Sequence, residues 1–97
     1  INCRVIDLRW LSDINQQKLV AATSPCDKVL IVDECRHTGS ISEALVTMLS
    51  EGSEQPPTLK RITAEDSFIP LGSAAYAVLP STEEIVNTAV ELVKPNA

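Results

Sequence analysis

Hydrophobic positions along the chain change period repeatedly, and these changes predict strands and helices in alternation. Residues 29–32 form a continuous apolar run, VLIV, between polar segments. Short continuous runs of this kind are typical of a parallel strand that is covered on both faces. Residues 3–8, with β-branched Val5 and Ile6 at their centre, predict an earlier strand. Residues 59–63 predict a third, weaker strand, and the charges of Lys60 and Arg61 favour a position near the sheet edge.

Apolar positions at helical spacing predict a helix after each strand. The clearest helical face follows the second strand and consists of Ile41, Ala44, Leu45, Met48 and Leu49. Ser40 is the expected N-cap of this helix, with Glu43 as its capping-box partner. Gly52 is expected to end it in the left-handed conformation.

The first and last helices begin with the same signal. Asp13 followed by Gln16, and Ser81 followed by Glu84, each match the capping-box spacing. A short helix is expected at residues 73–78, inside the long connection between the third strand and the last helix. Strand–helix units repeated in this way imply parallel strands joined by right-handed crossovers. The sequence therefore predicts a three-layer α/β/α, Rossmann-like domain with a mostly parallel sheet.

Length and charge narrow the class of protein. Ninety-seven residues correspond to one domain. Eight basic and thirteen acidic residues give a net charge of −5, which argues against nucleic acid and anionic membrane surfaces as partners. The apolar runs are far shorter than the ~20 residues of a membrane span. Three scattered cysteines without a CxxC motif indicate reduced thiols, so we expect a cytoplasmic location and no disulfides.

The polar loop after the second strand is the main candidate for binding. It leads into a capped helix, and ligands of such folds gather beyond the carboxyl ends of the strands. Its anion-binding candidates are Arg36, His37, Thr38, Gly39 and Ser40. The alternative is that the glycine and serine only make a tight strand-to-helix turn and that the polar side chains face water. No phosphate-binding glycine motif supports a nucleotide.

Hypotheses of catalysis or metal binding in the same region have less support than anion binding. Cys35 with His37 resembles a thiol nucleophile and its base near a helix N-terminus, but no third group or oxyanion site is visible. Asp33 with Glu34 is either a pair of carboxylates for acid–base chemistry, or a helix cap and a solvated side chain. One histidine and three scattered cysteines lack metal-ligand spacing. We therefore assign no catalytic residue and no metal ligand.

Two acidic loops are candidates for contact with a basic partner. They contain Glu51 and Glu54 after the second helix, and Glu65 and Asp66 after the third strand. The alternative is a solvated acidic surface that binds nothing.

Four segments together resemble one known family. They are VIDLRWLSD at residues 5–13, VDECRHTGSISEAL at 32–45, RITAEDSFIP at 61–70 and LPSTEEI at 79–85. In order and spacing they are similar to the transketolase C-terminal domain. The nearest variety is the beta-type domain of the pyruvate and branched-chain 2-oxoacid dehydrogenase decarboxylating components. The sequence departs from the family pattern in three places: the first segment lacks a proline before Asp13, Ser40 replaces a glycine, and Phe68 replaces a proline.

The resemblance implies a function in assembly. In this family thiamine diphosphate and magnesium are bound by other domains or by a partner chain, and the C-terminal domain packs in the subunit interface. In the multienzyme complexes it helps to dock the acyltransferase core. We therefore expect no bound cofactor and no activity from this chain alone. We expect it to form oligomers and to belong to an oxidoreductase acting on 2-oxoacids, in the cytoplasm or the mitochondrial matrix.

The resemblance also bears on domain organisation and on the alternatives. The family domain has a further strand and helix before the segment at residues 5–13, so we expect residues 1–97 to be the later part of that domain and a fragment of a longer protein. One alternative is the same domain of a transketolase or a deoxyxylulose-phosphate synthase. Another is a standalone α/β module that binds an anion through residues 36–40.

Overall fold

Two parallel strands form the centre of the molecule, and the computed structural model describes residues 1–95. Strand β1 (Lys28–Arg36) pairs with β2 (Thr58–Ala64), and the register runs from Lys28 opposite Thr58 to Asp33 opposite Thr63. The register then shifts, so that Arg36 lies opposite Ala64. Two of the three predicted strands, those at residues 29–32 and 59–63, are confirmed. The first is longer than its apolar run, because four polar residues after Val32 continue the extended backbone.

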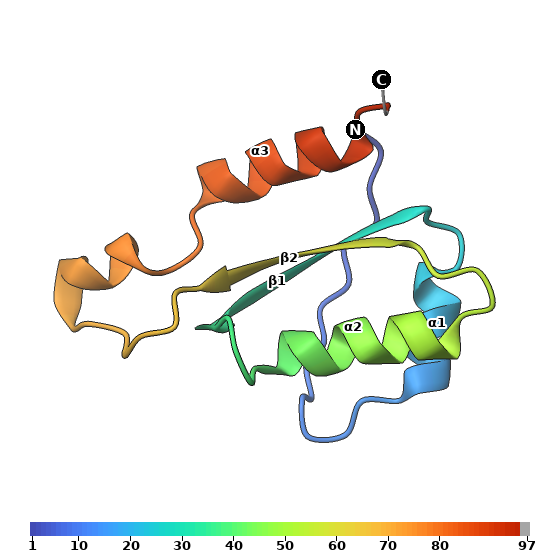
Figure 1. The fold of residues 1–97 in the computed structure, drawn as a ribbon, viewed down its shortest axis with the longest axis horizontal. Coiled ribbons are helices and arrows are strands. Elements are labelled where there is room, and N and C mark those ends of the chain that lie inside the picture. The colour runs from blue at the N-terminus through green and yellow to red at the C-terminus, as the bar shows by residue number, and fades with distance from the viewer. Residues whose placement is uncertain (96–97) are drawn as a thin grey trace.

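Helices cover both faces of this sheet. Figure 1 shows α1 (Gln16–Thr23) and α2 (Ile41–Gly52) on one face and α3 (Thr82–Val93) on the other. The connection from β2 to α3 contains a short 3₁₀ helix, η1 (Gly72–Ala77), close to the expected short helix. The arrangement is the expected three-layer α/β/α architecture with a parallel sheet. Within residues 1–95, no helix has the length and apolar character needed to span a bilayer.

The main core lies between β1 and the two helices on its α2 side. Its buried side chains are Leu19 of α1, Ile31 of β1, and Leu45 and Leu49 of α2. Leu49 is only 1% exposed. The helical stripe read from the sequence of α2 therefore faces the sheet, with Ile41 and Met48 packed around the buried residues.

The helix ends differ in part from the expected caps. Ser81 accepts a hydrogen bond from the Glu84 amide, as the capping pattern predicts. Helix α1 begins later than expected, because Asn15 and not Asp13 accepts a hydrogen bond from the amide of Lys18. The expected left-handed Gly52 is wrong: this residue is the last of α2, and among the described residues only Gly39 and Gly72 have a positive φ.

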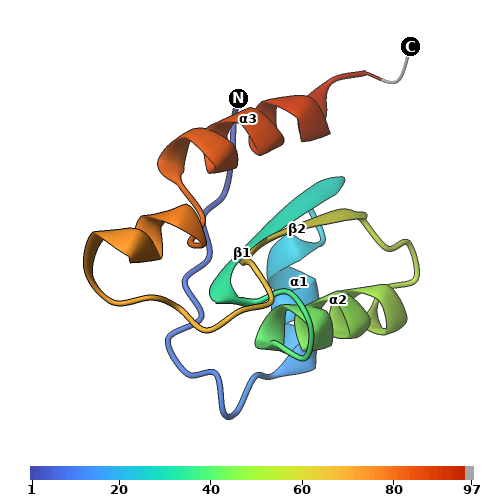
Figure 2. The ribbon, with the colours of Figure 1, turned by 60° about the vertical axis from the view of Figure 1, so that its left-hand side comes forward.

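The strand expected at residues 3–8 is wrong. Figures 1 and 2 show an irregular segment that runs from the side of α3 past the sheet to α1. Its attachments to the rest of the chain are a hydrogen bond from Arg4 to the carbonyl of Ala22 and the packing of Leu8 on the core. Val5 is 87% exposed. β-Branched residues favour a strand only where a neighbouring strand pairs with them, and none pairs with this segment among the described residues.

Candidate functional site

Polar side chains from three elements meet at the carboxyl ends of the two strands. We call Asp33, His37, Thr38, Arg61 and Asp66 the strand-end cluster. β1 supplies Asp33 and leads into His37 and Thr38, while β2 supplies Arg61 and leads into Asp66. The N-terminus of α2 lies at the same place because it follows β1 directly. The fold therefore brings together residues that are 28 positions apart in sequence.

Asp33 is the buried anion of this cluster. One carboxylate oxygen accepts a hydrogen bond from the Cys35 amide at 2.9 Å, and the other accepts one from the Ser42 amide at 3.1 Å. Burial raises the pKa of Asp33, but these two amides and the hydroxyls of Ser42 and Ser40 outweigh it, so the pKa is lower than usual. Asp33 thus takes over the capping role expected of Ser40, whose side chain makes no cap hydrogen bond and contacts the Ser42 hydroxyl instead.

Arg61 ties β2 to the loop that follows β1. Its guanidinium donates to the carbonyl of His37 at 2.9 Å and to the Ser42 hydroxyl at 3.0 Å. It also lies 3.2 Å from Nε2 of the His37 ring, and Nδ1 of that ring lies 3.1 Å from the Thr63 hydroxyl. Because a guanidinium only donates hydrogen bonds, Nε2 acts as the acceptor and Nδ1–H donates to Thr63. The imidazole is therefore held in one tautomer between two residues of β2.

Asp66 holds the other side of the same loop. Its two carboxylate oxygens accept hydrogen bonds from the amide of Thr38 at 2.8 Å and from the Thr38 hydroxyl at 2.6 Å. Both hydrogen bonds lower the pKa of Asp66, and the bond from the Thr38 hydroxyl has the larger effect. The nearby His37 lowers this pKa further. Asp66 is thus a structural tie between the two strand ends as well as a surface acid.

The predicted anion-binding residues 36–40 are brought together, but several of their donors are already engaged. Arg36 donates to the carbonyl of Thr38, and Gly39 turns the chain with a φ of 75°. Two carboxylates, those of Asp33 and Asp66, accept from the amides of Ser42 and Thr38. The chain's own acids therefore lie where an external anion would bind. Binding of an anion by this loop stays a prediction, and it requires displacement of Asp66.

The thiol next to this loop is not activated. Cys35 is exposed. The charge of Asp33, followed by burial and a hydrogen bond to Asp33, raises the pKa of the Cys35 thiol. A nucleophilic cysteine needs a lowered pKa. The ring nitrogens of His37 contact Arg61 and Thr63. The geometry thus favours helix capping by Asp33. It favours neither a Cys35–His37 nucleophile nor acid–base catalysis by Asp33 and Glu34.

The four acidic docking candidates lie at two separate places. Glu51 and Glu54 lie at the end of α2, before β2 begins, and Glu65 and Asp66 follow the last residue of β2. The seven residues of β2 separate the two pairs. At about 3.3 Å per residue this is roughly 20 Å. One small partner surface therefore contacts one pair or the other.

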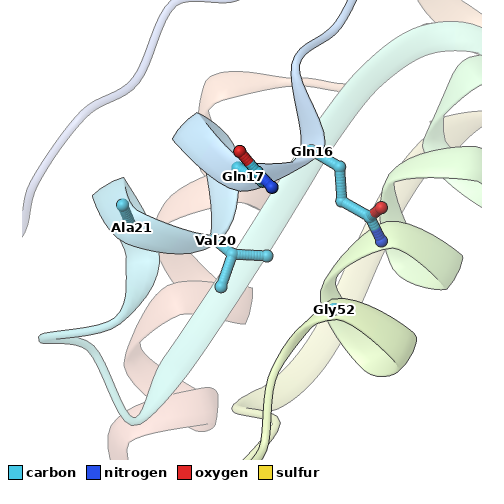
Figure 3. Close-up of a pocket in the computed structure, with 5 residues that line it drawn as sticks. All are labelled: Gln16, Gln17, Val20, Ala21 and Gly52. Atoms are coloured by element: carbon cyan, nitrogen blue, oxygen red, sulfur yellow. The ribbon is translucent and has the colours of Figure 1, made fainter.

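A shallow hollow of about 280 Å³ lies between α1 and the end of α2. Figure 3 shows that its lining comes from Gln16, Gln17, Val20 and Ala21 of α1 and from Gly52. Gln16 reaches across to α2, where its amide donates to the carbonyl of Met48 at 3.1 Å. A side chain at Gly52 would lie 2.9 Å from Gln16 and 3.0 Å from Val20, so the glycine allows close packing of the helices here. The hollow has no charged lining and suggests no chemistry.

Arg61, Thr63 and Ser42 are the site residues that the sequence analysis missed. The sequence pattern indicates for Arg61 a position near the sheet edge and a place in a family-like segment, but no site role, although alternation along β2 places it on the same face as Thr63. That shared face was the available signal. The contacts to His37 and Ser42 depend on the pairing of β1 with β2, which no local pattern reveals.

The sequence matches the family described as "Transketolase, C-terminal domain" over residues 1–85. The chain belongs to the transketolase C-terminal domain family. This membership confirms the resemblance found in the four sequence segments, and it agrees with the α/β architecture of the structure.

The curated relatives of this transketolase C-terminal domain are longer proteins. The pyruvate dehydrogenase E1 component subunit beta of Staphylococcus aureus is 30% identical over 91 residues, which is 90% of this chain and 27% of that protein. The subunit beta of Bacillus subtilis is 25% identical over 92 residues, 92% of this chain and 28% of that protein. The 1-deoxy-D-xylulose-5-phosphate synthase of Halothermothrix orenii is 24% identical over 102 residues, 95% of this chain and 16% of that protein. The chain spans about a quarter of the length of the first two.

Proposed function

We propose that this chain is a non-catalytic assembly domain of a thiamine-diphosphate-dependent 2-oxoacid dehydrogenase. The similarity to pyruvate dehydrogenase E1 beta subunits supports the class of parent enzyme. The observation that carries the assembly role is the amount of apolar side chain that the structure leaves exposed. Domains in an oligomer bury such surface against their neighbours.

The exposed apolar side chains lie mainly on three parts of the chain: the N-terminal segment, the segment after β2, and α3. Phe68 is 100% exposed and Leu71 is 95% exposed, while Tyr76 is 81% and Ile69 50% exposed. Large apolar residues this exposed are unusual on a monomer when they occur side by side. Helix α3 adds three exposed valines, and the N-terminal segment adds Ile1, Val5, Ile6, Trp10 and Leu11. These surfaces favour contact with other domains or subunits of the parent dehydrogenase.

The cofactor implied for the parent is thiamine diphosphate with magnesium. Magnesium bound to a diphosphate needs carboxylate or carbonyl oxygens gathered at one point. Residues 1–95 contain no group of three or more histidines, cysteines or acids placed to hold a metal ion. We propose that other domains or a partner chain bind the cofactor, as the family resemblance implies, and we derive no reaction step here.

For the acyltransferase core we propose docking through Glu51 and Glu54. The family resemblance implies a basic docking module on the acyltransferase, and these two acids are exposed at the end of α2. Of the second pair, Asp66 already accepts two hydrogen bonds from Thr38, which makes it a poorer partner for an incoming lysine or arginine. Glu65 remains exposed beside it. Charge complementarity of this kind mainly sets the association rate and its dependence on salt.

The alternative parent is a deoxyxylulose-phosphate synthase or a transketolase. The similarity to the Halothermothrix orenii enzyme, which extends over 95% of this chain, supports this alternative. Both parents use the same domain, so the geometry of the strand-end cluster does not separate them. The substrate of the parent enzyme separates them. A 2-oxoacid dehydrogenase acts on pyruvate or branched 2-oxoacids, and a transketolase or deoxyxylulose-phosphate synthase acts on sugar phosphates.

The assembly proposal predicts that the isolated chain has no turnover. We expect neither decarboxylation of pyruvate or a branched 2-oxoacid nor conversion of a sugar phosphate, even with added thiamine diphosphate and magnesium. A spectrophotometric assay with an artificial electron acceptor measures the first reaction, and chromatography of the products measures the second. Turnover that scales with chain concentration and is lost when Asp33 or Arg61 is replaced would contradict the proposal.

A further inference from the structure

His37 is the one histidine of the chain, and its contacts require a neutral ring. The ring lies between Arg61 and Thr63, which share one face of β2. Nε2 lies 3.2 Å from the guanidinium, and Nδ1 lies 3.1 Å from the Thr63 hydroxyl. Because a guanidinium cannot accept a hydrogen bond, Nε2 must carry a free lone pair here. The contact with Arg61 therefore exists only while His37 is unprotonated.

Protonation of His37 turns this contact from attractive to repulsive. Histidine is the side chain whose charge changes between about pH 5 and 8, and His37 is exposed to solvent. In the imidazolium both ring nitrogens donate, so two cationic donors would face each other across the 3.2 Å contact. The other bonds of Arg61, from Nη1 to the His37 carbonyl and to the Ser42 hydroxyl, do not depend on the charge of the ring. Protonation therefore breaks one specific contact of the strand-end cluster.

An anion lies close to the ring on the same side of the sheet. Asp66, which follows β2, is near enough for His37 to lower its pKa, although the Thr38 hydroxyl has the largest effect. A carboxylate has about four acceptor sites, and Thr38 occupies two of them, so Asp66 has room for a further donor. The surrounding segments also carry other charged side chains: Arg36 in the same loop, Asp33 and Glu34 of β1, Glu43 in the first turn of α2, and Glu65 beside Asp66.

The titratable neighbours with shifted pKa values keep one charge state across this pH range. Burial raises the pKa of Asp33, but its hydrogen bonds outweigh burial and leave it lowered. The bonds from Thr38 lower the pKa of Asp66, so both carboxylates stay ionised above pH 5. The charge of Asp33 raises the pKa of the Cys35 thiol, which therefore stays protonated below pH 8. Within the strand-end cluster, His37 is thus the residue that changes charge.

We propose that His37 is a pH-sensitive switch between the loop after β1 and the end of β2. The neutral ring accepts a hydrogen bond from Nη2 of Arg61. When the ring takes up a proton from solvent, it leaves Arg61 and donates to the carboxylate of Asp66. Arg61 keeps the His37 carbonyl, so the loop stays attached to β2 while the side chain changes its partner. The switch belongs to the strand ends and does not depend on which parent enzyme is correct.

NMR of the purified chain, labelled with ¹³C and ¹⁵N, tests the switch by titration from pH 8 to pH 5. The single histidine makes the ring signals unambiguous. At pH 8 we expect one tautomer, with the hydrogen on Nδ1. As the pH falls, the ring nitrogens, Nε of Arg61 and the carboxyl carbon of Asp66 should shift with one common midpoint. A mixture of tautomers at pH 8, or a titration to which Arg61 and Asp66 do not respond, would overturn the switch.

Charge variants provide a second test, because the two partners should act in opposite directions. Arg61→Gln removes the cation that opposes the imidazolium, so the midpoint should move to higher pH by roughly half a unit. Asp66→Asn removes the anion that attracts it, so the midpoint should move to lower pH by a similar amount. Lys60→Gln is the matched control: it removes a charge from the neighbouring exposed residue on the other face of β2 and should leave the midpoint unchanged.

Far-UV circular dichroism checks that the three variants remain folded. Shifts of the same sign in Arg61→Gln and Asp66→Asn, or a shift in Lys60→Gln as large as that in Arg61→Gln, would contradict the exchange of partners. The titration of the unmodified chain decides the question even if a variant fails to fold.

Discussion

Replacing Leu49 with alanine is expected to destabilise the chain by about 2–5 kcal/mol, the usual cost of removing a buried leucine side chain. Leu49 is the largest side chain that is fully buried, at 1% exposed, and it joins α2 to β1 and α1. Among the described residues, the other buried members of this cluster are Leu19, Ile31 and Leu45. Small domains are stable by about 5–15 kcal/mol, so the loss is a large part of the total.

Urea unfolding followed by circular dichroism measures this effect. The midpoint should fall, while the slope stays near that of the unmodified chain. Leu71→Ala is the matched control, because Leu71 is 95% exposed and should change the free energy of unfolding by less than about 0.5 kcal/mol. If both variants lose the same stability, the core is not where the structure places it.

Asp33→Asn is expected to cost about 1–3 kcal/mol at neutral pH, the penalty for leaving a buried hydrogen-bonding group without its partner. Asparagine keeps one acceptor oxygen but turns an NH₂ group toward an amide N–H, that of Cys35 or Ser42. The start of α2 then loses its anionic cap. Glu34→Gln, at the exposed neighbouring position, is the control and should have almost no effect.

The same residue predicts a pH dependence of stability. The pKa of Asp33 is lower in the folded chain than its ordinary value of 3.8. The unfolded chain therefore binds a proton more readily, and the stabilisation by Asp33 is complete above about pH 4 and is lost as the pH falls through the lower folded pKa. Thermal melting between pH 2 and 7 should show this loss in the unmodified chain and a smaller one in Asp33→Asn. Equal acid sensitivity of the two chains would contradict the cap.

Local patterns predicted the helices better than the strands. The stripe of α2 and the cap of α3 at Ser81 depend on neighbours three or four residues away, and both are confirmed. Residues 3–8 have the composition of a strand, but pairing depends on a distant neighbour, and this segment has none among the described residues. Local pattern therefore overstated the sheet by one strand.

The sequence predicted the location of the candidate site but not the hydrogen bonds that join its residues. The sequence indicated that polar residues gather where β1 ends and α2 begins. The sequence left open whether Asp33 is an acid–base residue or a helix cap. The two hydrogen bonds that Asp33 accepts from backbone amides favour the cap. The bonds from Arg61 to His37 and from Thr38 to Asp66 join residues 24 and 28 positions apart. Such contacts follow from the register of the sheet, which periodicity does not fix.

The assembly role is tested most directly by docking. We would titrate the purified chain with the basic docking module of a pyruvate dehydrogenase acyltransferase by calorimetry, at low and at high salt. We expect binding that weakens as salt rises. The double variant Glu51→Lys, Glu54→Lys should largely abolish it, while Glu91→Gln on α3 should not change it. No binding at low salt, or binding that the double variant leaves unchanged, would contradict the account.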